Sequence, residues 1–207
     1  MTIRPLHFER RGEGPAVMLL HGFTGSGPSM SEVSHALARD FEVITPDLPG
    51  HGRSIAADDG PVHSFDDCLD RLAATLEQAG HARAHWIGYS MGARLALAFA
   101  LRLPERVASL LLAGARAGIE GASERAARRR ADEALAGRIE TDGIEAFVDE
   151  WLAQPLFASQ QRLGGEFVAA QRRQRLDNDA RSLAASLRGM GPGAQPPLFD
   201  DLPRLDV

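Results

Sequence analysis

The sequence predicts an α/β fold with a mostly parallel, doubly wound sheet in residues 1–113. Short apolar runs alternate there with amphipathic stretches, and this alternation of strands and helices is typical of a parallel sheet covered on both faces. The run AVMLL at residues 16–20 is continuously apolar, as expected of a strand buried on both sides. Expected strands cover residues 3–8, 16–20, 41–45, 84–88 and 107–113, and expected helices cover residues 31–39, 64–79 and 91–101.

Length, net charge and apolar runs limit the kinds of protein that this sequence can be. The 207 residues are enough for one domain with a sizeable core. A net charge of −5 argues against nucleic acid as a partner. The longest apolar run, at residues 95–101, is far shorter than the roughly 20 residues of a membrane helix. With one cysteine, Cys68, and no signal peptide at the N-terminus, the chain is expected to be cytoplasmic and free of membrane contacts.

Residues 114–190 carry no strand pattern and are expected to form a helical lid over the sheet. Residues 191–207 are expected to connect this lid back toward the core, so that the chain divides into 1–113, 114–190 and 191–207. Within the lid, Asp142 is expected to cap a helix that Pro155 ends. The apolar face of that helix comprises Ile144, Phe147, Val148, Trp151 and Leu152.

The strongest chemical motif is the pentapeptide GYSMG at residues 88–92, which matches a G-x-S-x-G nucleophile elbow. In such an elbow the serine occupies a tight turn between a strand and a helix. The residues two before and two after it must be very small, and here both are glycine. An apolar strand pattern precedes the motif and a helical pattern follows it. Ser90 is therefore the predicted nucleophile.

Two further loops follow predicted strands. The loop HGFTG at residues 21–25 is expected to face the serine, and the backbone N–H groups of Phe23 and Met91 would form an oxyanion hole. The loop DLPGHGRS at residues 47–54 has the glycines and the proline of a rigid turn beside the site. Its His51, like His21 of the first loop, is interpreted as a residue that shapes the loop.

Arginines near the serine indicate an anionic substrate. Arg94 lies one helical turn after Ser90, and the lid carries arginine-rich stretches at residues 124–130 and 171–176. Guanidinium groups bind carboxylates through two parallel hydrogen bonds, which a pocket for neutral esters does not need. For any single lid arginine, the alternative is a solvated helix face balanced by nearby acids.

These motifs resemble the α/β-hydrolase superfamily over residues 10–113, in order and in spacing. The sequences HGFTGS (21–26) and GYSMGAR (88–94) are similar to one family within it, the 2-succinyl-6-hydroxy-2,4-cyclohexadiene-1-carboxylate synthases of menaquinone (vitamin K2) biosynthesis. Lid segments within residues 118–128, 151–160 and 175–196 resemble the same family. The resemblance covers nearly the whole chain and implies an α/β-hydrolase fold with a helical lid.

The resemblance implies a lyase that acts on a small anionic molecule. A base would remove a proton from a cyclohexene ring that carries carboxylate, succinyl and enolpyruvyl groups, and pyruvate would be eliminated. Ser90 would be this base, and the N–H groups of Phe23 and Met91 would stabilise the developing oxyanion. No metal or cofactor is implied. The positions that match carboxylate-binding or pocket-lining residues of the family are Arg94, Arg128, Arg175, Tyr89 and Trp151.

The sequence departs from the family in one respect, because no histidine follows Ser90. All seven histidines precede it, whereas this fold places the triad in the order serine, acid, histidine. The last strands of the fold would also be absent. We therefore expect that the chain is incomplete, that its activity alone is low, and that a complementing C-terminal segment could be a partner.

Two alternatives remain open at this point. The first is a general carboxylic-ester or C–C hydrolase of the same superfamily, which would form an acyl intermediate on Ser90. The second is a catalytically inactive domain that binds a partner through an open sheet edge at the strand around Leu110.

Overall fold

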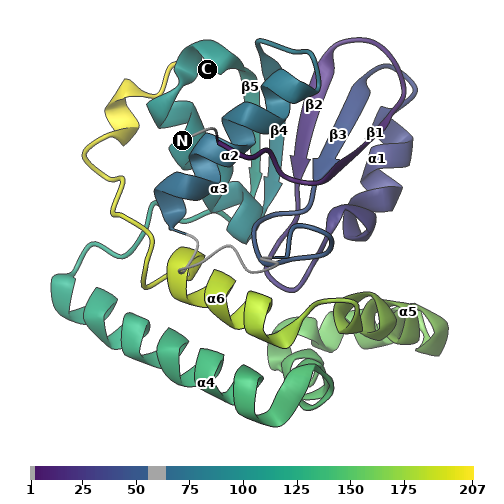
Figure 1. Ribbon diagram of the computed structural model, residues 1–207, viewed down its shortest axis with the longest axis vertical. Helices are drawn as coiled ribbons and strands as arrows, with labels where there is room; N and C mark the ends of the chain where they lie inside the picture. The colour runs from purple at the N-terminus through teal and green to yellow at the C-terminus, as the bar shows by residue number, and fades with distance from the viewer. Residues whose placement is uncertain (1–2, 56–63) are drawn as a thin grey trace.

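The computed structural model describes residues 3–55 and 64–207, and within them a five-stranded sheet forms the centre of the molecule (Figure 1). Strand β1 pairs antiparallel with β3, and all other neighbouring strands are parallel. The prediction of a mostly parallel α/β sheet is therefore confirmed. From edge to edge the strands are β1 (Phe8–Arg11), β3 (Glu42–Pro46), β2 (Ala16–Leu20), β4 (Ala84–Tyr89) and β5 (Val107–Ala113).

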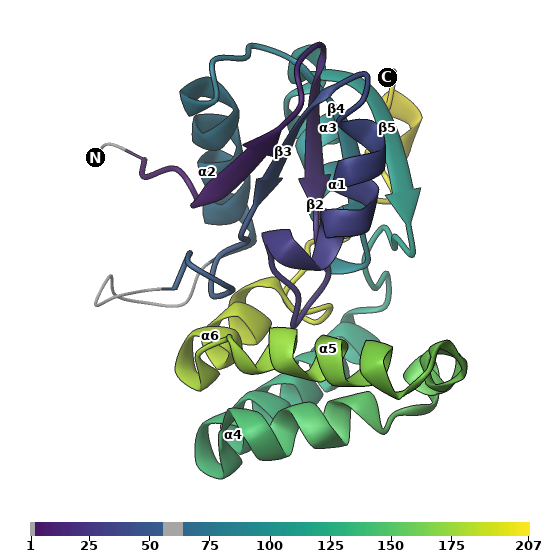
Figure 2. The ribbon, with the colours of Figure 1, turned by 90° about the vertical axis from the view of Figure 1, so that its right-hand side faces the viewer.

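Helices cover both faces of the sheet (Figure 2). Helix α1 (Ser31–Leu37) lies on one face, and α2 (Phe65–Gln78) and α3 (Met91–Arg102) lie on the other. Successive residues of β2 alternate between these faces, as strand geometry requires. Val17 belongs to the apolar cluster beside α1, and Met18 belongs to the cluster beneath α2 and α3. This is the doubly wound arrangement that the sequence predicts.

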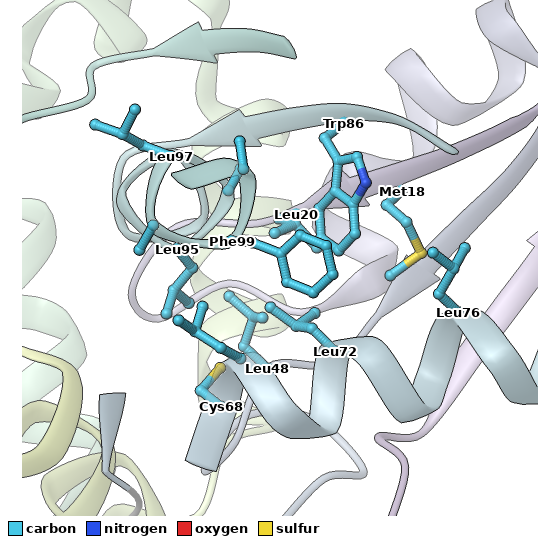
Figure 3. Close-up of a cluster of buried hydrophobic side chains, with 14 of the residues drawn as sticks. Met18, Leu20, Leu48, Cys68, Leu72, Leu76, Trp86, Leu95, Leu97 and Phe99 are labelled. Carbon is cyan, nitrogen blue, oxygen red and sulfur yellow. The ribbon is translucent and has the colours of Figure 1, made fainter. Parts of the chain in front are cut away.

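The larger core cluster lies between the sheet and helices α2 and α3 (Figure 3). Trp86 of β4 stacks on Phe99 of α3 with ring centroids 4.0 Å apart. Leu72 and Cys68 of α2 are fully buried beside them. Burial raises the pKa of the Cys68 thiol, so this residue packs as a small apolar group. The core fixes β4 against α3, and the serine elbow connects these two elements.

The N-terminal edge strand lies later in the chain than predicted. The sequence predicts this strand at residues 3–8, whereas β1 comprises Phe8–Arg11. The backbone N–H of the buried Leu6 donates to the hydroxyl of Thr75 on α2, at 2.9 Å. Because this segment bonds to α2, it is not available to the sheet, and pairing with β3 starts at Phe8.

A layer of helices lies beyond the carboxyl ends of the parallel strands (Figure 2). It contains α4 (Ala122–Leu152), α5 (Gly165–Leu176) and α6 (Ala180–Met190), which we call the helical layer. Helix α4 bends at Gly143, whose φ of 82° and ψ of 170° are not helical. The layer takes up much of the segment that the sequence analysis assigns to a lid. The division into functional units at residues 113 and 190 stays a prediction.

The predicted apolar face of the second half of α4 is confirmed. Phe147 and Val148 are buried in a cluster with Leu183 of α6, and Ile144, Trp151 and Leu152 pack against it. The helix ends at Leu152, three residues before Pro155. The proline instead opens a 3-10 helix, η3 (Pro155–Leu163), where the missing N–H of proline costs nothing.

Ion pairs on the outside of the helical layer connect its helices. Arg172 of α5 donates to Asp149 of α4, with Nε and Oδ1 2.6 Å apart. Arg188 of α6 contacts Glu140 of α4, with Nη1 and Oε1 also 2.6 Å apart.

Within residues 3–55 and 64–207, none of the helices combines the length and the hydropathy that a membrane span requires.

The burial of Leu72 predicts how far truncation of this side chain lowers the free energy of unfolding. Leu72→Ala removes a fully buried side chain beneath Trp86 and Phe99, so we expect the free energy of unfolding to fall by about 2–5 kcal/mol. Urea denaturation followed by circular dichroism measures the change. Leu163→Ala, at a side chain that is 62% exposed, is the matched control and should change stability by less than about 0.5 kcal/mol. Equal effects of the two variants would contradict this assignment of the core.

Candidate active site

The turn that carries Ser90 is as tight as the sequence predicts. Ser90 has a φ of 52° and a ψ of −108°, a strained conformation for a residue with a side chain. A Cβ on Gly88 would lie 2.5 Å from the carbonyl oxygen of Gly92, and a Cβ on Gly92 would lie 2.6 Å from that of His21. Both glycines are therefore required, because β4, α3 and the loop after β2 approach each other at backbone distance.

The loop at residues 21–26 lies directly beside the serine. The N–H of Gly92 donates to the carbonyl of His21 at 3.1 Å, which joins this loop to the start of α3. A Cβ on Gly22 would lie only 3.3 Å from Cβ of Ser90. Phe23 follows in the wall of the cavity that contains Ser90. The loop thus faces the serine as predicted, while the oxyanion role of the Phe23 and Met91 N–H groups stays a prediction.

His21 and His51 shape the two loops, as the sequence analysis proposed. His21 Nε2 accepts from the N–H of Leu48 at 2.9 Å, and its Nδ1 lies 2.8 Å from the carbonyl of Gly22. His51 Nε2 accepts from the N–H of Thr24 at 3.3 Å. Each ring therefore connects the loop after β2 with the loop after β3.

Both rings are neutral and fully buried. Burial lowers the pKa of His21 from 6.5 to about 4. Burial, reinforced by the neighbouring His21, lowers the pKa of His51 from 6.5 to about 3. With their ring nitrogens bonded to the backbone, neither histidine is available as a base for Ser90.

A cavity of about 190 Å³ opens at Ser90 between the sheet and the helical layer. Four of the predicted site residues meet there besides the serine, and they come from the loop after β2, from β4, from α4 and from α5. The wall contains no histidine, aspartate or glutamate among the described residues, so its formal charge comes from one arginine. The lining comprises Gly22, Phe23, Gly25, Ser29, Met30, Tyr89, Ser90, Trp151, Leu156, Phe157, Gln160, Gln171 and Arg175.

Arg175 is the positively charged group of this cavity. One guanidinium nitrogen, Nη1, donates to the side chain and the backbone carbonyl of Gln171, at 2.7 and 2.9 Å. Its Nε is buried and has no hydrogen-bond partner among the described residues, and the same is true of Nε1 of Trp151. Partial burial lowers the pKa of Arg175, so the charge is costly without an anion. Two residues of the cavity wall therefore carry N–H donors without a hydrogen-bond partner, and one of them is a cation for which the described residues supply no ion pair.

Arg94 and Arg128, the two other predicted substrate arginines, do not line this cavity. The buried guanidinium of Arg94 donates to the carbonyl of Met190 at 3.0 Å and to Oε1 of Gln195 at 3.1 Å. Burial, together with the charge of Arg128, lowers the pKa of Arg94 to about 10. Arg128 itself pairs with Asp132, with Nε and Oδ1 2.7 Å apart. Met190 and Gln195 thus accept from Arg94, and Asp132 accepts from Arg128, where the sequence predicts a bound substrate.

Several residues of the site could not be found by motif. Gln171 precedes Arg175 by four positions, so helical spacing alone could have indicated that it holds the arginine. Phe157 lies 5.6 Å from the Arg175 guanidinium, measured to the ring centroid, and no sequence signal marks it.

No group of three or more His, Cys, Asp or Glu residues that could hold a metal ion occurs in residues 3–55 and 64–207.

Comparison with known sequences shows one family. The sequence profile of the α/β-hydrolase fold matches residues 15–171. A Bacillus subtilis protein, provisionally named a 2-succinyl-6-hydroxy-2,4-cyclohexadiene-1-carboxylate synthase, is 42% identical over 94% of this chain and 72% of its own length. The synthase of that name from Escherichia coli O1:K1 / APEC is 35% identical over 91% of this chain and 72% of its own length.

Solved structures agree with the sequence comparison. MenH from S. aureus superposes with a TM-score of 0.90 at 31% identity, over 97% of this chain and 77% of that chain. A thermophilic esterase from Thermogutta terrifontis, in a malate-bound structure, gives a TM-score of 0.82 at 29% identity, over 97% and 71% of the two chains. The likeness therefore includes the helical layer as well as the sheet.

The buried histidines predict a specific pH dependence of stability. Each neutral ring takes up a proton on unfolding, so its contribution is complete above the ordinary pKa of 6.5 and decreases as the pH falls toward the folded value. We expect about 1.4 kcal/mol per pH unit for each ring between pH 6 and pH 5. His51→Gln should remove the share of one ring from this slope in urea titrations.

The matched control for this prediction is His35→Gln, at an exposed position of α1. It should leave the slope of unfolding free energy against pH as in the unmodified chain. If His51→Gln and His35→Gln gave the same slope as the unmodified chain, the neutral state of His51 would be contradicted.

Proposed function

The chain belongs to the α/β-hydrolase fold family and, within it, to the 2-succinyl-6-hydroxy-2,4-cyclohexadiene-1-carboxylate synthases, and on this premise we propose how its cavity acts. The enzyme is a lyase, and its substrate is a hydroxycyclohexene with carboxylate, succinyl and enolpyruvyl groups. The products are pyruvate and the cyclohexadiene for which the relatives are named.

The observation that carries the proposal is the unpaired Arg175 guanidinium in the cavity of Ser90. A partly buried cation gains most from an anion that is buried with it, because the local dielectric constant is low. Each carboxylate of the substrate is such an anion, and Trp151, another residue of the cavity wall, carries an N–H donor without a partner among the described residues. Tyr89 and Phe157 give the ring an apolar surface to pack against.

The chemical step is a proton abstraction followed by loss of a leaving group. The ring C–H bond breaks, its electron pair forms the new C=C bond, and the C–O bond to the enolpyruvyl group breaks. The oxygen leaves as the enolate of pyruvate, which is then protonated on carbon. Ser90 lies on the cavity wall and would accept the ring proton. The N–H groups of Phe23 and Met91 would stabilise the negative charge that develops on the substrate oxygen.

Ser90 can act as a base only if another group first removes the proton of its hydroxyl. A serine hydroxyl retains its proton near neutral pH, and imidazole is the group that normally removes it. His21 and His51 are committed to loop backbones, and no histidine follows Ser90 in this sequence. We therefore expect elimination by the 207-residue chain alone to be thousands-fold slower than by a complete triad. Binding of substrate and product does not depend on that base.

The remaining predictions concern the charge of the substrate, the location of the protein and the alternative of an ester hydrolase. The substrate is a small anionic molecule, which agrees with the cationic cavity. The cytoplasmic location and a complementing C-terminal segment stay predictions. An ester hydrolase would use the same elbow and oxyanion loop, and the Thermogutta terrifontis esterase shares this fold. The cation in the cavity favours the lyase, because a neutral ester gains nothing from it.

Binding of the cyclohexadiene product tests the proposal. Arg175→Ala removes a charge-assisted hydrogen bond worth about 1.5–3 kcal/mol, so the dissociation constant should rise about 10- to 150-fold. Isothermal titration calorimetry with purified product measures the constant. Arg173→Ala, at an exposed arginine of the same helix, is the matched control and should bind as the unmodified chain does.

Two results would contradict the proposal. One is absence of product binding by the unmodified chain at millimolar concentration. The other is rapid hydrolysis of a neutral aryl ester with an acyl group on Ser90, at a rate that Arg175→Ala leaves unchanged. The second result would favour the ester hydrolase.

A further inference from the structure

Asn178 lies at the junction of three segments that form the cavity, although it does not line the cavity itself. It is the only asparagine of the chain and occupies the turn between α5 and α6. Its side chain is buried, with 4% of the residue exposed. Such a position requires that every polar atom of the amide finds a partner.

The amide meets this requirement with bonds to two distant loops. Oδ1 accepts from the N–H of Gly52, in the loop after β3, at 3.0 Å. Nδ2 donates to the carbonyl of Thr24, in the loop after β2, at 3.0 Å. The two partners are 126 and 154 residues away in sequence, so these bonds join the helical layer to both loops.

The partner residue Thr24 holds a strained conformation. Its φ of 69° is in the left-handed region, which is unfavourable for a β-branched residue. Its N–H donates to His51 Nε2 and its carbonyl accepts from Asn178, so the residue is held on both sides. Thr24 directly follows Phe23, whose N–H is the expected oxyanion donor. The direction of that N–H therefore depends on how Thr24 is held.

The same amide also bonds to the backbone of Arg175. Nδ2 of Asn178 donates to the Arg175 carbonyl at 3.1 Å, and the backbone N–H of Asn178 donates to it at 3.3 Å. One side chain thus fixes the end of α5, where the substrate arginine stands, relative to the loop of Phe23. The Arg175 side chain also contacts Gln171 of its own helix and Phe157 of η3, and it interacts electrostatically with Tyr89 of β4. The hydrogen bonds of Asn178 add a direct connection from the end of α5 to the loop of Phe23.

We propose that Asn178 is a positioning residue, which keeps the Arg175 guanidinium in register with the Phe23 loop across the cavity. The inference rests on the proposed function, because it concerns the binding of that substrate and product. Asn178 touches neither of them and acts through Arg175 and Thr24. The amide is required because its two N–H groups meet two carbonyl oxygens, whereas a carboxylate would place an oxygen against both.

The exchange Asn178→Asp tests the proposal with the least change in shape. It keeps the acceptor for Gly52 and loses both donors. We expect the dissociation constant of the cyclohexadiene product to rise about tenfold in isothermal titration calorimetry. Gln78→Glu makes the same amide-to-acid exchange at the exposed end of α2, far from the cavity, and should leave the constant unchanged.

Calorimetry separates positioning from mere stability, because a poorly folded sample binds less product per chain without changing the constant of the folded fraction. Positioning raises the dissociation constant at unchanged stoichiometry. A double variant adds a second criterion: in an Arg175→Ala background, Asn178→Asp should raise the constant by less than about twofold, since the group it positions is gone. If the acid prevents folding, Asn178→Ala carries the same test without added charge.

The possible outcomes are distinct. If the unmodified chain binds no product, the proposed function fails, and this inference fails with it. If the unmodified chain binds product and Asn178→Asp binds equally well, the positioning role is wrong and the function stands. A lower stoichiometry at an unchanged constant, or an equal effect with and without Arg175, would likewise overturn the positioning role.

Discussion

The close approach of backbone at the serine turn is the constraint on which the rest of the site depends. With Gly88 against Gly92 and Gly92 against His21, any added Cβ would lie about 2.5 Å from a carbonyl oxygen. Only this closeness lets β4 pass into α3 in one residue and leaves Ser90 at a φ of 52°. The Trp86–Phe99 stack beneath the turn supplies apolar burial that can offset such strain.

The loops around the serine are held by buried side chains, among them Asp47, whose carboxyl oxygens accept from the N–H groups of Gly27 and Arg53. Neutral His21 and His51 connect the loop after β2 to the loop after β3, and Asn178 connects both to the helical layer. A buried neutral ring or amide meets its hydrogen-bonding requirement with backbone partners alone. Arg175 remains the formal charge on the cavity wall, which makes an anionic ligand the natural occupant.

The sequence predicted those features that follow from local rules. A continuous apolar run located β2, and the glycine spacing located the turn at Ser90. It did not predict features that depend on distant partners. Because Leu6 bonds to α2, β1 begins later in the sequence than predicted. Met190 and Gln195 bind the Arg94 guanidinium, which does not line the cavity. Asn178 gave no signal, because its bonds reach residues more than 120 positions away.

A crystal structure of this chain with the cyclohexadiene product bound would show whether Arg175 anchors the ligand in the cavity of Ser90. We expect the product between Ser90 and the helical layer, with one carboxylate on the Arg175 guanidinium and a ring face toward Ser90. The Asn178 bonds to the two loops should be intact. Product bound elsewhere, or in the cavity with its carboxylates turned away from Arg175, would contradict this role of Arg175.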